Sequence, residues 1–280
     1  MTSSVQLDSY LQAWSLTDAH LLTTTATSSI YTVQHQGETV VLKLLNEVGA
    51  ADEGGGAVAL DYWQGQGAVR LLQQDAHAHL LEYAEGADLA KRVRQGNDSE
   101  ATRMIAGVLN QLHSASSPLP TAGLKPLSLW FRSLFRRAQQ EHTEELAALF
   151  QQGAAVAEKL LADPREVRVL HGDIHHENIR HKAGRGWLAF DPKGLIGERT
   201  YDAANTLCNP PGMPELVLNE NRLRSQAALL AREARLDEGR LLAYTFAYAC
   251  LSASWSMEDG GDATAALTIA SMLRHDVQAR

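Results

Sequence analysis

The segment from Val169 to Asp191 constrains the fold most, because it places strand-like residues inside a largely helical half of the chain. Ile179–His181 and Trp187–Phe190 are predicted to be two short strands, and the glycines between them permit a tight turn. Such a hairpin holds Asn178 and Asp191 at its open end, on opposite strands. An amide oxygen and a carboxylate placed in this way can share one Mg²⁺ ion.

The rest of the chain divides into a part rich in strands and a helical part. Ile30–His35 and Thr39–Leu45 are β-branched and apolar runs on either side of a Gln-Gly turn, and helical spacing dominates beyond Gly86. The pattern predicts an α+β fold with two lobes. We expect a small β-rich lobe over residues 1–85, a hinge at about 82–86, and a larger helical lobe over residues 86–280.

Composition excludes several classes of protein. The formal net charge is −8 and 45% of the residues are hydrophobic, which argues against general nucleic-acid binding, a polybasic membrane contact or wholesale disorder. The same charge suits a cationic small-molecule partner. Cys208 and Cys250 lie in apolar surroundings and are expected to be free buried thiols. Since no leader pattern or membrane-length apolar run is visible, we expect a cytoplasmic protein. We also expect it to be a monomer.

Lys43 is the most informative residue of the small lobe. It lies in Val40–Leu45 with apolar residues on both sides, and a lysine in a packed strand needs an anion or must reach solvent. Glu53 is one candidate partner, and the phosphates of a nucleotide are another. Asp173, in a loop five residues before Asn178, is placed to orient an attacking hydroxyl group. Metal ligands, an acid and a phosphate-binding cation are the parts that phosphoryl transfer requires.

These motifs resemble the catalytic segment of the aminoglycoside phosphotransferases, a branch of the protein-kinase-like fold. The Asp173–Asn178 spacing matches the kinase catalytic loop, and the segments 170–178 and 191–198 are similar to streptomycin 6-phosphotransferases and hydroxyurea phosphotransferases. The similar segments run from about residue 40 to residue 260. The resemblance implies a bilobal kinase-like enzyme that uses MgATP to phosphorylate a hydroxyl group of a small molecule, with the streptomycin 6-hydroxyl as the leading acceptor.

The resemblance also implies roles for individual residues. It makes Asp173 the catalytic aspartate, Asn178 and Asp191 the Mg²⁺ ligands, Lys43 a phosphate-binding residue paired with Glu53, and Glu82, Tyr83 and Ala84 the hinge that meets adenine. Two features depart from the protein-kinase pattern. Pro192-Lys193 replaces the Phe-Gly that follows the metal-binding aspartate, and the phosphate-covering segment 23–29 contains no glycine.

The acceptor site is less well defined by the sequence. Four residues are candidates for contact with a cationic substrate: His176, Glu198, Asp202 and Glu258. For Asp202, a structural role in stabilising the helical lobe is equally well supported. For Glu258, the alternative is that it lies in a solvent-exposed acidic loop. His171 is expected to bind loop backbone rather than zinc. Two other functions stay open, namely a kinase with a metabolic acceptor and a nucleotide-binding pseudoenzyme.

Overall fold

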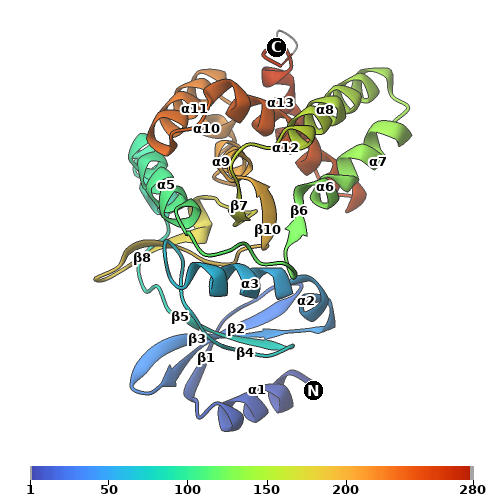
Figure 1. The fold of residues 1–280 in the computed structure, drawn as a ribbon. Coiled ribbons are helices and arrows are strands. Elements are labelled where there is room, and N and C mark those ends of the chain that lie inside the picture. The colour runs from blue at the N-terminus through green and yellow to red at the C-terminus, as the bar shows by residue number, and fades with distance from the viewer. Residues whose placement is uncertain (1, 278–280) are drawn as a thin grey trace.

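A computed structural model describes residues 2–277 of the chain (Figure 1). The strands of the first third form one sheet, and most of the helices gather in the second part of the chain, with the predicted β8–β9 hairpin between them. No helix within these residues is long and apolar enough to cross a membrane. The arrangement confirms the predicted α+β fold with a β-rich first part and a helical second part.

The first part is a five-stranded antiparallel sheet in the order β1-β2-β3-β5-β4. Its strands are β1 (Thr17–Thr24), β2 (Ser28–His35), β3 (Glu38–Leu45), β4 (Leu71–Gln74) and β5 (Ala78–Glu82). The predicted hairpin of β2 and β3 is confirmed, and its turn places both Gln36 and Gly37 at positive φ. One face of the sheet packs against α1 (Thr2–Ala13) through a small core that includes Trp14, Val33 and Leu42.

Two short helices, α2 (Glu47–Asp52) and α3 (Gly54–Trp63), follow β3 and lead toward the second part of the chain (Figure 1). The glycines that open α3 allow its backbone to approach the segment after Asp191 very closely. A Cβ atom added to Gly56 would lie 2.3 Å from the carbonyl oxygen of Pro192, a distance that real Cβ atoms do not show. The glycine run therefore fixes where α3, and with it Glu53, sits against the catalytic segment.

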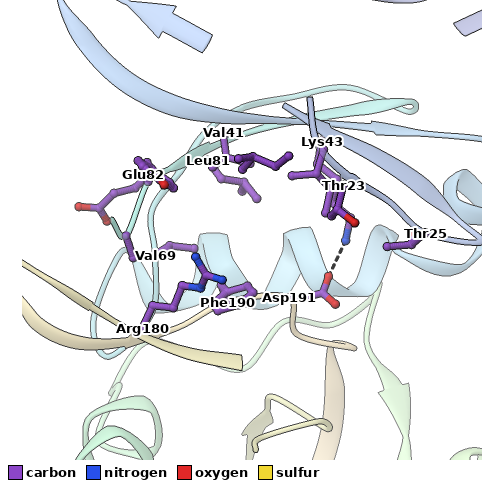
Figure 2. A pocket seen from close by; sticks show the side chains of 14 residues that line it. Thr23, Thr25, Val41, Lys43, Val69, Leu81, Glu82, Arg180, Phe190 and Asp191 are labelled. Carbon is purple, nitrogen blue, oxygen red and sulfur yellow. Dashed lines mark hydrogen bonds and ion pairs between the residues drawn. The ribbon is translucent and has the colours of Figure 1, made fainter. Parts of the chain in front are cut away.

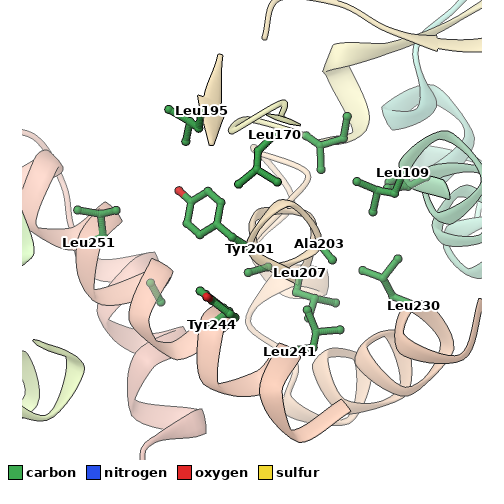
Figure 3. Close-up of a cluster of buried hydrophobic side chains, with 14 of the residues drawn as sticks. Leu109, Leu170, Leu195, Tyr201, Ala203, Leu207, Leu230, Leu241, Tyr244 and Leu251 are labelled. Carbon is green, nitrogen blue, oxygen red and sulfur yellow. The ribbon is translucent and has the colours of Figure 1, made fainter. Parts of the chain in front are cut away.

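The second part is built around α9 (Thr200–Leu207), every residue of which is buried (Figure 3). Tyr201, Ala203 and Leu207 of this helix meet Leu230 and Tyr244 of the surrounding helices. The other helices of this part are α4 (Leu89–Arg94), α5 (Asp98–His113), α6 (Leu127–Trp130), α7 (Arg132–Gln140), α8 (Glu144–Ala162), α10 (Pro214–Val217), α11 (Glu220–Ala234), α12 (Glu238–Glu258) and α13 (Thr264–Leu273).

Short strands lie between the sheet and these helices. β10 (Leu195–Glu198) pairs in parallel with β6 (Lys125–Pro126) and antiparallel with β7 (Val167–Leu170), while β8 (Ile179–Lys182) and β9 (Gly186–Ala189) form the predicted hairpin. The helical residues between 127 and 162 are divided among α6, α7 and α8. Glu141 leaves the helical region, and its carboxylate accepts the backbone N–H groups of the two residues after it, which ends α7.

Candidate active site

A cavity of about 440 Å³ lies between the sheet and the β8–β9 hairpin (Figure 2). Val41 and Leu81 of the sheet cover one side, and Arg180 and Phe190 of the hairpin form the other. Thr23 of the glycine-free segment also lines the cavity. Five of the residues that the sequence predicts to meet nucleotide or metal line this cavity: Lys43, Glu82, Tyr83, Ala84 and Asp191.

Lys43 occupies one end of the cavity, where its ammonium group is only slightly exposed and forms ion pairs with both Glu53 and Asp191. Contact with Glu53 was expected from the sequence, and the structure confirms it. Burial alone would lower the pKa of Lys43, but the two carboxylates outweigh burial and raise that pKa. Thr27 in turn donates a hydrogen bond of 2.6 Å to Glu53. The ammonium group of Lys43 is therefore fixed by two carboxylates and stays positively charged at this end of the cavity.

Asp191 has the backbone conformation of a strained functional residue. Its φ of 59° lies in the left-handed region that non-glycine residues seldom adopt, although aspartate tolerates it better than most. Burial would raise the pKa of its carboxyl group, but the ammonium groups of Lys43 and Lys193 outweigh burial and lower the pKa to about 2. The side chain is thus an anion at all ordinary pH values.

Asp173 is held in the loop before the hairpin by two asparagines. Asn205 of α9 donates a 2.8 Å hydrogen bond to Oδ1 of Asp173, and the Asn178 amide donates a 3.0 Å bond to its backbone oxygen. The carboxylate keeps 30% of its surface exposed. Lys193 lies between Asp173 and Asp191, which lines the end of the cavity. The Nζ atom of Lys193 is 3.9 Å from Asp173 Oδ2 and 3.6 Å from Asp191 Oδ2.

The donor set at the end of the hairpin fits a magnesium ion. Because the nitrogen of the Asn178 amide is bound to Asp173, its oxygen points elsewhere and can act as a ligand. Asp191 supplies a carboxylate from the segment just after β9. The backbone N–H of Phe190 donates a 3.0 Å hydrogen bond to the backbone carbonyl of Asn178, which joins the two sides of the hairpin at this end. Among the described residues no cluster of three acidic, histidine or cysteine side chains forms a metal cage. Two oxygen ligands match the way Mg²⁺ is held jointly by protein, phosphate and water.

Asp202 lies away from the cavity and braces the catalytic loop, which corrects its assignment as an acceptor contact. It is buried, and its carboxylate accepts the backbone N–H groups of His171 at 2.9 Å and Gly172 at 2.7 Å. Its third partner is His113 of α5, at 2.9 Å. The His171 ring bonds the Phe190 carbonyl at 3.0 Å, as expected for a residue that orders the loop backbone. Both carboxylate oxygens of Asp202 therefore accept hydrogen bonds from groups of the protein itself.

Two other acceptor candidates are also buried away from any substrate. Glu198 forms a two-point ion pair with Arg240 of α12, and His176 lies fully buried with neither ring nitrogen bonded to a described group. Burial lowers the pKa of His176 to about 3, so the ring is neutral. Neither side chain can meet an acceptor in this conformation. Glu258, at the end of α12, keeps 31% of its side chain exposed beside Arg136, so it stays a candidate.

The segment 82–86 is tied to the tip of the β8–β9 hairpin. Lys182 donates a 2.8 Å hydrogen bond to the Tyr83 carbonyl, and the carboxylate of Glu82 forms an ion pair with Arg185. The Tyr83 carbonyl therefore faces the hairpin, and the backbone N–H of Glu82 is bound to the Arg70 carbonyl at 2.9 Å. Sequence reasoning missed Arg180, whose strand position gave no sign that it lines the cavity, and left open the role of Lys193.

Comparisons with known proteins agree with this geometry. The profile of the aminoglycoside/hydroxyurea antibiotic resistance kinases matches residues 13–260. A streptomycin 3''-kinase of Klebsiella pneumoniae is 40% identical over 255 residues, which cover 89% of this chain and 92% of the relative. A streptomycin 6-kinase of Streptomyces griseus is 33% identical over 76% of this chain and 70% of its own length. Among solved structures, aminoglycoside phosphotransferase APH(4)-Ia in complex with AMP-PNP and hygromycin B has the same fold, with a TM-score of 0.69, 16% identity and coverage of 97% of this chain and 98% of its own.

Proposed function

Because the chain belongs to the aminoglycoside/hydroxyurea antibiotic resistance kinase family, we propose that it transfers the γ-phosphoryl group of ATP to a hydroxyl group of streptomycin and so inactivates the antibiotic. Membership makes the chain a small-molecule kinase. One observation carries the assignment of the site: Lys43 and Asp191 line one end of the cavity, and Lys193 contacts both Asp191 and Asp173. ATP as the donor implies that the enzyme works in the cytoplasm.

In the proposed reaction the acceptor hydroxyl oxygen forms a bond to the γ-phosphorus while the bond from that phosphorus to the β,γ-bridging oxygen breaks. ADP leaves, and the hydroxyl proton passes to the carboxylate of Asp173. The hydrogen bond from Asn205 fixes that carboxylate toward the acceptor. Lys43 binds the phosphates, and Glu53 holds its ammonium group in place. Glu82, Tyr83 and Ala84 border the part of the cavity that receives the base.

Asn178 and Asp191 would hold Mg²⁺, which supplies positive charge to the phosphates when it is bound. Lys193 contributes a second cation at the same end, between the catalytic carboxylate and the metal-binding one. Positioning and charge neutralisation are the main contributions that a protein makes to phosphoryl transfer. The site supplies both with residues from β3, the catalytic loop and the segment after β9.

The position of phosphorylation on streptomycin divides the relatives. The relative with 40% identity is named a 3''-kinase, while the relatives named 6-kinases are 33% and 26% identical. The higher identity of the 3''-kinase, over 89% of this chain and 92% of that relative, favours the 3''-hydroxyl over the 6-hydroxyl that the motifs alone suggested. The same relatives argue against a metabolic acceptor. Three of them are named streptomycin kinases and the fourth a hydroxyurea phosphotransferase, and none is named for a metabolic acceptor.

The test is to incubate the purified protein with MgATP and streptomycin, and to locate the phosphate in the product by mass spectrometry and ³¹P-coupled NMR. We expect a monophosphate at the 3''-position. Asp173→Asn is the matched variant, because it keeps the shape of the side chain and removes the proton acceptor. It should bind ATP as the wild type does and lose turnover by about 10²–10⁴-fold. Turnover of the variant at the wild-type rate would exclude Asp173 as the base. A wild type that binds ATP but phosphorylates no acceptor would instead support the pseudoenzyme hypothesis.

A further inference from the structure

We propose that the guanidinium group of Arg180 stacks on the face of the nucleobase and so forms the floor of the base site. This inference rests on the proposed use of a nucleotide and adds a residue to its binding. Arg180 is the second residue of β8, directly opposite Leu188 of β9. Figure 2 shows its side chain rising from the hairpin toward the middle of the cavity, on the side opposite Val41 and Leu81.

The backbone of Arg180 is fixed from both sides. Its residue pairs with Leu188 within the hairpin and forms an isolated antiparallel bridge with Asp88, just after the segment that borders the base site. The guanidinium carbon lies 5.7 Å from the centroid of the Phe190 ring, which supports the side chain from one flank. The direction of the side chain is thus set by strand register and by packing rather than by a flexible loop.

The charge of Arg180 has no protein counter-ion among the side chains that the structure describes. Its Nε atom is buried and bonded to none of them. The carboxylates that line the cavity have other partners: Glu82 pairs with Arg185 and lies 4.0 Å from Lys182, and Asp191 pairs with Lys43. Arg180 as a whole is half-buried, so a ligand that covers its guanidinium group must replace the water around that group with another favourable contact. The face of a purine offers such a contact, since guanidinium groups stack well on aromatic rings.

The position along the cavity separates a base contact from a phosphate contact. Lys43 and Asp191 mark the phosphate end, and Figure 2 places Arg180 at the other end, beside Val69 and Glu82. Because a planar base inserted between Val41 and Arg180 would present its face to the guanidinium, the contact should not depend on the groups at the base edge. The site should therefore gain affinity for ATP and GTP equally from Arg180.

The experiment compares the wild type with Arg180→Met, which keeps a long side chain at this position and removes the planar, charged guanidinium group. Binding of ATP, GTP and inorganic tripolyphosphate, each with Mg²⁺, is measured by calorimetry. We expect the dissociation constants of ATP and GTP to rise together by about five- to tenfold, and that of tripolyphosphate to stay within about twofold. Arg180→Lys keeps the positive charge but lacks the planar group. Its dissociation constants for ATP and GTP should lie between those of the wild type and Arg180→Met. Arg103→Met, which removes an exposed cation of α5, is the matched control and should match the wild type.

Each contrary result has a distinct meaning. An equal loss of tripolyphosphate affinity would mean that Arg180 binds phosphate, and a changed ratio of ATP to GTP affinity would mean that it binds the base edge. Unchanged ATP affinity in Arg180→Met would show no contact at all. All three overturn the proposal. A wild type that binds neither ATP nor GTP would instead refute the proposed function. Melting temperatures of the variants show whether the fold is intact.

Discussion

Replacing Glu198 by glutamine distinguishes a substrate contact from a structural ion pair. If Glu198 bound the cationic acceptor, the variant would raise the KM for streptomycin and leave stability alone. The structure predicts the reverse result. The Glu198 side chain is 1% exposed, and its two oxygens each accept a 2.6 Å hydrogen bond from Arg240, whose side chain is 12% exposed. Further donors are the Arg165 backbone at 2.9 Å and the Thr200 hydroxyl at 2.8 Å.

The size of the effect follows from what the substitution leaves behind. Removing one partner of a buried ion pair costs about 3–5 kcal/mol, because the other charge stays buried without compensation. Glutamine keeps the shape and one acceptor, so we expect about 3 kcal/mol for Glu198→Gln. For a domain of this size about 2–4 °C is lost per kcal/mol, which corresponds to a fall in Tm of about 6–12 °C.

The assay is thermal unfolding followed by circular dichroism, together with steady-state kinetics at a temperature below both transitions. The double variant Glu198→Met with Arg240→Met is the control, because it removes both charges and should recover part of the loss. A melting temperature equal to that of the wild type, with a raised KM for streptomycin, would refute the structural role. Loss of stability without a change in KM would exclude the substrate role.

The same pair predicts how stability depends on pH. Burial would raise the pKa of Glu198, but the hydrogen bonds from Arg240 and the backbone outweigh burial and lower that pKa in the folded protein. A carboxylate whose folded pKa is lowered stabilises the protein fully above its ordinary pKa, and this contribution is lost as the pH falls below that value. The stability of Glu198→Gln should therefore decrease less steeply than that of the wild type below about pH 4.3.

Three further substitutions test other parts of the site. Lys193→Met should lower kcat by about 10²-fold with little change in the KM for ATP, read by ADP release, since its cation lies where charge develops. Gly56→Ala would place a Cβ atom 2.3 Å from the Pro192 carbonyl oxygen, so we expect a lower urea midpoint and loss of activity, whereas normal values would mean that α3 can shift. Arg185→Met leaves the Glu82 carboxylate, 10% exposed, without its closest partner, and should cost about 2–3 kcal/mol in urea unfolding and weaken ATP binding.

The parts of the fold that sequence predicted well depend on short-range patterns. The β2–β3 hairpin follows from two alternating runs joined by Gln36-Gly37, and the catalytic hairpin follows from its glycines and the five-residue spacing of Asp173 and Asn178. The point at which α7 ends and α8 begins was not predicted, because helical spacing continues through this part of the sequence. There the carboxylate of Glu141 competes for backbone N–H groups, an effect that periodicity does not reveal.

The acceptor residues could not be predicted for a different reason. A carboxylate that binds a cationic substrate and one that binds a buried cation of the protein are the same residue type in the same kind of segment. What distinguishes them is a partner far along the chain: Arg240 lies 42 residues after Glu198, and His113 lies 89 residues before Asp202. No local spacing encodes such a pairing. The proposed catalytic and metal-binding residues could be located from the sequence because Asp173, Asn178 and Asp191 lie within one loop and one hairpin. Arg180 could not be predicted for the same reason. Its position on a short strand does not indicate that it faces a cavity, because the opposite wall of that cavity is formed by the distant five-stranded sheet.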